Sequence, residues 1–150
     1  MRQIYLSLIY PHLQYCSAIW GGAYTTYIDN LLVSQKKILR IMFFKSCYAH
    51  TKELFRDYKL LTIPNIIRVQ TSLFIHKSLH SLNTDQSFTL FPHNATRRPF
   101  HLRLPLCRIS HSKRSILSRC SQWNALPKPL ITDSNFILFQ RKLMKIMFNN

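Results

Sequence analysis

Apolar residues recur at three- and four-residue steps along much of the chain, and this period constrains the fold more than any other feature. Between residues 28 and 42 the apolar positions follow one stripe of a helix, and Gln35 falls on the same stripe. A second periodic segment begins after Thr62, at the pair Ile63-Pro64, which is typical of a helix start. This spacing is that of amphipathic helices. The sequence therefore predicts a mainly α protein, built as a small helical bundle.

Prolines, glycines and capping residues predict where the helices begin and end. In the N-terminal part we expect a helix over residues 3–10 and a helix over 11–20, which Pro11 opens and Gly21-Gly22 ends. Thr25 or Thr26 is expected to cap the periodic helix that follows, with Asp29 in its first turn, and Thr51 is expected to cap a helix over 52–58. Towards the C-terminus we expect a helix over 113–123, a turn over 124–129 and a last helix capped by Asp133 or Ser134, with an apolar stripe of Phe136, Phe139, Leu143 and Met147. In the helix after Thr62, the expected buried face consists of Ile63, Ile66, Ile67, Leu73 and Phe74.

The helical period is absent from residues 83–112, which contain three prolines and many polar residues. We expect a long irregular connection there, with a short extended piece at 101–104, where apolar and basic residues alternate. The predicted organisation is a helical region over 1–82, an irregular basic connection over 83–112 and a C-terminal helical region over 113–150.

The charge of the chain is strongly one-sided, with 21 Lys and Arg against 5 Asp and Glu, a formal net charge of +16. This balance excludes an ordinary near-neutral enzyme domain and indicates a polyanionic partner, nucleic acid first and an anionic membrane surface second. No acid lies between Asp85 and Asp133. The candidate phosphate contacts form two groups: Lys36, Lys37 and Arg40 on the first periodic helix, and Arg97, Arg98, Arg103, Arg108, Lys113, Arg114 and Arg119 in the acid-free interval. An ordinary solvated basic surface is the alternative for both groups.

Motifs for catalysis, cofactors and metals are missing from the sequence. The two glycines are adjacent, so no glycine-rich phosphate loop can form, and the five acids are too scattered to suggest a carboxylate site. The four cysteines form no CxxC pair and are expected to be reduced thiols. A zinc site from His101, Cys107, His111 and Cys120 fits no finger spacing, and His76 with His80 is a lone i,i+4 pair. We therefore expect no cofactor, no metal site and no catalytic residue.

Residues 3–28 carry no charged side chain, which raises the alternative of a membrane-associated basic protein anchored by this segment. Pro11, His12 and the glycine pair interrupt the run, so it is a poor membrane span. We expect a protein located inside the cell, in the nucleus or the cytoplasm, with membrane as the less favoured partner.

Five segments, in this order along the chain, resemble motifs downstream of the polymerase palm in reverse transcriptases of non-LTR (LINE-type, jockey-like) retrotransposons. They are IYLSLIYPHLQYCSAIWG at 4–21, LLVSQKKILRI at 31–41, HT with LF and LLTI at 50–63, N with TR at 94–97, and WNALP with F and FQRK at 123–142.

The resemblance implies that residues 1–82 are thumb-like and that the chain corresponds to the thumb and C-terminal part of such an enzyme. The family's palm motif, of the [FY]xDD type, has no counterpart here, because the chain contains no Asp-Asp pair. We therefore expect a noncatalytic part of an RNA-directed DNA polymerase with no activity alone. Its implied role is binding the backbone of a primer–template, RNA or DNA, largely without sequence preference. The missing palm of a parent protein is the second implied partner.

Overall fold

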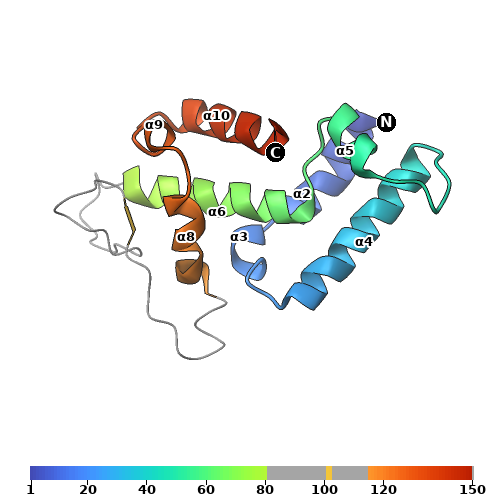
Figure 1. The fold of residues 1–150 in the computed structure, drawn as a ribbon, viewed down its shortest axis with the longest axis horizontal. Coiled ribbons are helices and arrows are strands. Elements are labelled where there is room, and N and C mark those ends of the chain that lie inside the picture. Colours follow the sequence, from blue (N-terminus) through green and yellow to red (C-terminus); the bar gives the residue numbers. More distant parts are fainter. Residues whose placement is uncertain (81–100, 103–114, 150) are drawn as a thin grey trace.

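Figure 1 shows a computed structural model of the chain, which describes residues 1–80, 101–102 and 115–149. The described residues are mainly helical, so the predicted fold class is confirmed. Apart from residues 101–102, the expected irregular connection over 83–112 lies outside the described residues. The elements are α1 (Arg2–Ile4), the π-helix η1 (Tyr5–Ile9), α2 (Tyr10–Gln14), α3 (Ser17–Trp20), α4 (Thr25–Met42), α5 (Lys52–Asp57), α6 (Ile63–His80), the 3-10 helix η2 (Ile116–Arg119), α8 (Cys120–Asn124), α9 (Lys128–Ile131) and α10 (Phe136–Asn149).

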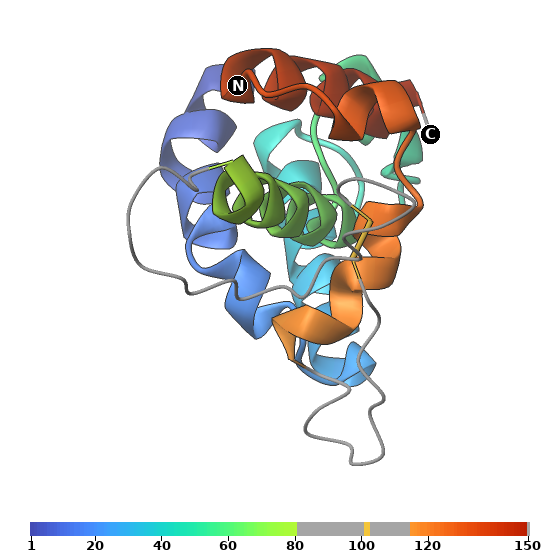
Figure 2. The ribbon, with the colours of Figure 1, turned by 90° about the vertical axis from the view of Figure 1, so that its left-hand side faces the viewer.

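Helix α6 is the centre of the molecule. Figure 2 shows α10 above it, the N-terminal helices on one side and α8 on the other. Because neighbours cover several sides, the buried residues of α6 are not restricted to one stripe, and Val69, Ile75 and Leu79 are buried as well. Phe74, expected on the buried face, is instead 41% exposed.

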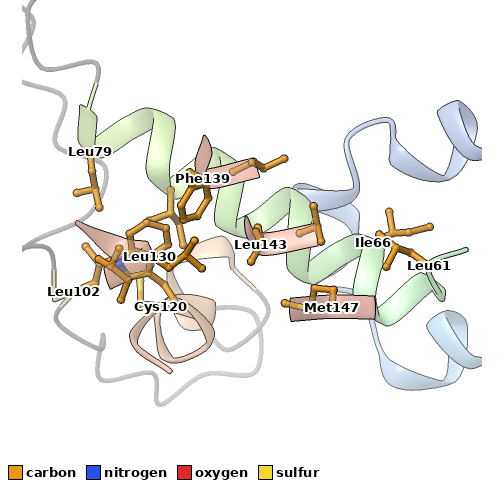
Figure 3. Close-up of a cluster of buried hydrophobic side chains, with 14 residues drawn as sticks. Leu61, Ile66, Leu79, Leu102, Cys120, Leu130, Phe139, Leu143 and Met147 are labelled. Carbon is orange, nitrogen blue, oxygen red and sulfur yellow. The ribbon is translucent and has the colours of Figure 1, made fainter. Parts of the chain in front are cut away.

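Buried apolar side chains form two clusters. In the larger one, Phe139, Leu143 and Met147 of α10 pack toward α6 (Figure 3). Trp123 of α8 belongs to the same cluster, and its ring centroid lies 5.7 Å from that of Phe139. This cluster joins the expected regions 1–82 and 113–150, and Leu102 is fully buried in it. The smaller cluster lies between the N-terminal helices, α4 and α5, and consists of Tyr5, Leu39, Leu54, Phe55 and Leu60.

The N-terminal helices differ from the predicted pair. The Tyr10 amide donates to the Tyr5 carbonyl five residues back, which makes a π-turn just before Pro11. Proline has no N–H for the ladder, so a widened turn here accommodates it. The predicted helix over 11–20 is wrong in its middle, because it stops at Gln14 and Cys16 is left-handed, with φ 50°. The Trp20 indole N–H donates to the Tyr15 carbonyl over 2.7 Å, which satisfies a carbonyl at this break.

The predicted break at Gly21-Gly22 is confirmed, since α3 ends at Trp20. A Cβ atom on Gly21 would lie 2.4 Å from Cγ2 of Ile67 and 2.5 Å from the carbonyl oxygen of Ser17. Both distances are far below van der Waals contact, so Gly21 is needed for the close approach of α3 to α6.

Several helix ends differ from prediction. Helix α4 has no side-chain cap: Thr25 is its first residue, Tyr24 precedes it, and Asp29 lies beyond the first turn. The cap of α10 is Asn135, whose Oδ1 accepts the amides of residues 137 and 138 at 3.0 and 3.3 Å, rather than Asp133 or Ser134. The Asp133 carboxylate pairs with Lys142 instead.

The segments before α10 also differ from prediction. The helix expected over 113–123 is a 3-10 turn followed by the short α8, within the described part. The expected turn over 124–129 does begin where α8 ends. It then runs into the unpredicted helix α9, because Pro129 occupies the first turn, where a missing amide proton costs no hydrogen bond.

Candidate nucleic-acid interface

A buried glutamine fixes the position of α4. Gln35 Nε2 donates to the Tyr5 hydroxyl at 2.7 Å and to the Leu61 carbonyl at 2.9 Å, while its Oε1 accepts the Ile63 amide at 3.1 Å. Burial raises the pKa of Tyr5, an effect that the hydrogen bond from Gln35 partly offsets, so the phenol stays neutral. All three polar partners are satisfied inside the protein, and α4 is held against the start of α6.

On α4, Lys36 and Arg40 lie one helical turn apart and so share a face of the helix. Arg40 Nε donates to the Ala49 carbonyl at 2.9 Å, which ties the end of the following loop back to α4. Thr51, the residue before α5, is buried. These contacts bring His50 and Lys52 toward the same face of α4.

A pocket of about 390 Å³ lies between these elements, and we call it the α4–α5 pocket. Three permanent cations, Lys36, Arg40 and Lys52, converge on it, and none of its described lining residues carries a carboxylate. Its other lining residues are Leu32, His50, Thr51, Phe55 and Thr62. Two ammonium groups and a guanidinium around one pocket, with two hydroxyl groups beside them, are suited to bind phosphate oxygens.

Two other pockets of the described part are less suited to a phosphate. One lies beside the paired rings of His76 and His80 and has Lys77 as its permanent cation. The other lies along α10, where Arg141 and Lys145 alternate with apolar side chains. Of these three pockets in the described part, the α4–α5 pocket has the most cations together with polar lining groups.

The first predicted basic group is only partly brought together. Lys36 and Arg40 line the α4–α5 pocket, whereas Lys37, one residue further along the helix, is exposed and does not line it. Most of the second predicted group, namely Arg97, Arg98, Arg103, Arg108, Lys113 and Arg114, lies outside the described residues.

Arg119 was expected on a phosphate-binding surface, but in the structure it lies inside the protein. Its side chain is buried, and its guanidinium donates to the Thr71 hydroxyl at 3.1 Å and to the Ala18 carbonyl at 2.7 Å. Burial lowers the pKa of this guanidinium. The cation joins α3 to α6 and η2 inside the protein, and so it is not presented to a ligand.

Nothing in the described residues forms a metal centre of three or more His, Cys, Asp or Glu side chains. The rings of His76 and His80 pack with centroids 4.3 Å apart, and Nε2 of His76 donates to the Asp133 carbonyl at 2.7 Å. Of the four residues weighed above as zinc ligands, Cys107 and His111 lie outside the described part. Burial raises the pKa of the Cys120 thiol, which disfavours the reactive thiolate.

Within the described ranges, no helix is both long and apolar enough to cross a membrane.

Sequence reasoning missed His50 and Lys52 as members of the pocket. Eleven residues separate Arg40 from Lys52, and the intervening loop has no period that would predict where it returns. The i,i+4 spacing of Lys36 and Arg40 was a usable signal, because it separates this pair from Lys37.

Comparisons of the chain with protein-family models, with curated proteins and with solved structures find no match.

Proposed function

We propose that the α4–α5 pocket binds the phosphate backbone of a nucleic acid. The observation that carries this proposal is the convergence of Lys36, Arg40 and Lys52 on one pocket that has no acid among its described lining residues. A phosphodiester placed there meets three cations, and its binding releases counterions from the nucleic acid. Such contacts position a strand without reading its bases, so we expect little sequence preference.

The resemblance to non-LTR reverse transcriptases supports the same proposal from a separate direction. The segment LLVSQKKILRI at 31–41, which resembles a basic helix of that family, forms part of α4 and contributes Lys36 and Arg40 to the pocket. We therefore propose that the chain is a noncatalytic, thumb-like part of an RNA-directed DNA polymerase. Its ligands are then RNA or DNA, and its protein partner is the palm of the parent polymerase.

The test is binding of the full chain to an RNA–DNA primer–template, followed by fluorescence anisotropy from about 50 to 200 mM salt. We expect affinity to fall steeply with salt. The double variant Lys36→Ala/Lys52→Ala is expected to lower the slope of log affinity against log salt by about 2, roughly 1 for each phosphate that is no longer neutralised. Arg40 is left in place because it also supports the loop.

The matched control is Lys77→Ala/Lys128→Ala, which removes the same charge from exposed positions on α6 and α9. Helix α9 lies at the opposite end of the molecule from α5 (Figure 1). The control variant is expected to keep most of the affinity. Binding that is absent or insensitive to salt, or an equal loss in the two double variants, would contradict the proposal.

A further inference from the structure

We propose that the α4–α5 loop, residues 43–51, stacks the unpaired bases of a single-stranded nucleic acid whose phosphates lie in the α4–α5 pocket. This inference rests on the proposed function and adds to its phosphate contacts a preference for an unpaired strand over a duplex. The loop projects at the outer edge of the molecule, beyond the helices that it connects (Figure 1).

Two aromatic side chains of this loop are almost fully exposed. Phe44 is 86% exposed and Tyr48 is 90% exposed, more than any other large hydrophobic residue of the described part. By contrast, Trp123 and Phe139 are completely covered. Exposed rings on one short loop are the kind of surface on which bases stack.

The backbone at Phe44 is unfavourable for the residue it carries. Helix α4 ends with the Lys45 amide on the Arg40 carbonyl, at 2.9 Å, and the Phe44 amide on the Ile41 carbonyl, at 3.2 Å. This is the Schellman arrangement, in which the left-handed position is usually glycine. Phe44 occupies that position with φ 52°, a strained conformation for a bulky residue. A strained, exposed aromatic ring contributes little to folding, which points to a role in binding.

The loop is held in place at both ends. The ring of Phe43 stacks on Tyr58 with centroids 3.9 Å apart, and Arg40 binds the Ala49 carbonyl near the other end. Between them, the Ala49 amide donates to the Ser46 carbonyl at 3.0 Å and closes a turn. A loop fixed in this way presents Phe44 and Tyr48 with little conformational entropy left to lose on binding.

Charge favours nucleic acid over other ligands for these rings. The loop contains Lys45 and no acid, and Arg40 before it on α4 and Lys52 after it on α5 line the α4–α5 pocket. In a duplex the bases are already stacked and paired, whereas an unpaired strand offers free base faces next to its phosphates. A lipid surface prefers cations spread over a broad apolar face, but here they converge on a concave pocket.

The experiment compares binding of the full chain to an oligothymidine of about 12 nucleotides and to a duplex of equal length. The variant Phe44→Leu/Tyr48→Leu keeps apolar side chains but removes both aromatic faces. We expect its affinity for the single strand to fall roughly fivefold to a hundredfold, with duplex affinity unchanged. The control Tyr15→Leu/Tyr27→Leu, which replaces exposed tyrosines on other segments, is expected to bind like the unchanged chain.

An unchanged single-strand affinity in the Phe44→Leu/Tyr48→Leu variant overturns the inference. If duplex binding still depends on Lys36 and Lys52, the proposed function survives that result, whereas no binding of any nucleic acid removes both. A third arm uses phosphatidylserine–phosphatidylcholine vesicles. Vesicle binding that the leucine variant retains, without a preference for single strands, overturns the inference in favour of a membrane surface.

Discussion

The two ends of the molecule use the same residue types in opposite ways. Where η2 meets α3 and α6, Arg119 is buried and donates to a hydroxyl and to carbonyls of the protein. At the α4–α5 end, Arg40 uses its Nε for the Ala49 carbonyl and remains part of an open cationic pocket. A cation therefore becomes structural where the fold supplies buried acceptors around it, and it stays available to ligands where the fold does not.

Aromatic residues follow the same division. Trp123 and Phe139 are fully buried, with ring centroids 5.7 Å apart, and His76 stacks on Phe139 at 4.2 Å. Phe44 and Tyr48, in contrast, are exposed on the α4–α5 loop. Apolar area at the first end therefore supports stability, and apolar area at the second is left for a ligand.

The largest effect is expected from Arg119→Met, which tests the structural end of the molecule. The substitution removes a buried cation and leaves the Ala18 carbonyl and the Thr71 hydroxyl without their donor. We expect the free energy of unfolding to fall by about 3 kcal/mol, measured by urea denaturation. The exposed Arg141→Met on α10 should change it by less than about 0.5 kcal/mol.

Nucleic-acid affinity of the folded Arg119→Met protein should stay the same. A loss of affinity without a loss of stability would place Arg119 at a ligand surface after all and would contradict the division between the two ends.

An intermediate effect of the opposite sign is expected from Phe44→Gly, which tests the ligand-binding end. Glycine relieves the left-handed strain at φ 52° but adds freedom to the unfolded chain. We expect a net stabilisation of about 0.5–1 kcal/mol, read from the same urea curves, together with weaker single-strand binding.

Lys59 is the matched control, because it occupies the equivalent left-handed position after α5, with φ 49° and the Leu60 amide bonded to the Phe55 carbonyl. Lys59→Gly should stabilise by a similar amount and keep the aromatic loop intact. Destabilisation by Phe44→Gly would show that the Phe44 ring contributes to the fold, contrary to its assignment to the ligand-binding end.

The smallest effect is expected from a change of pH, which alters the free energy of unfolding through the protonation of His80. Burial first, and the charge of His76 second, lower the pKa of His80, while a hydrogen bond to the backbone of Ile131 partly offsets them. The folded state therefore takes up a proton less readily than the unfolded state, whose His pKa is about 6.5. The contribution of His80 is fully present above about pH 6.5 and is lost as pH falls toward the lower folded pKa.

Urea midpoints between about pH 5 and pH 8 measure this dependence. Lys77 lies on the same helix, and the Asp133–Lys142 pair lies on the elements packed against it. The substitution His80→Gln removes the group whose pKa is lowered, so it should flatten the curve. A variant as acid-sensitive as the unchanged chain would assign the effect to other groups.

Much of the fold could be predicted from the sequence, because helices depend on local periodicity. The stripe containing Gln35, the break at Gly21-Gly22 and the start at Ile63 all agree with the structure. Helix caps were harder to predict, since Asn135 and Asp133 are chemically similar candidates two residues apart. Which of them caps α10 depends on where α9 ends and where Lys142 lies.

The candidate site was predictable only to the level of one helix. The i,i+4 pair Lys36 and Arg40 was visible, but Lys52 reaches the pocket through a loop whose path no local pattern predicts. The strain at Phe44 was not visible either, because a left-handed residue is identified by its backbone rather than by its side chain.

The amino-acid sequence alone determines that the chain is helical and carries a large excess of positive charge. Helical periodicity is a pattern among neighbouring residues, and net charge is a sum over all residues, so neither depends on how the helices pack. Which cations face a ligand depends instead on the packing of the helices. Arg119 and Arg40 are alike in sequence terms, yet one meets carbonyls brought from 100 residues away and the other borders an open pocket. Burial and hydrogen-bond partners come from segments that are distant in the chain, and it is these contacts that separate a structural arginine from a binding one.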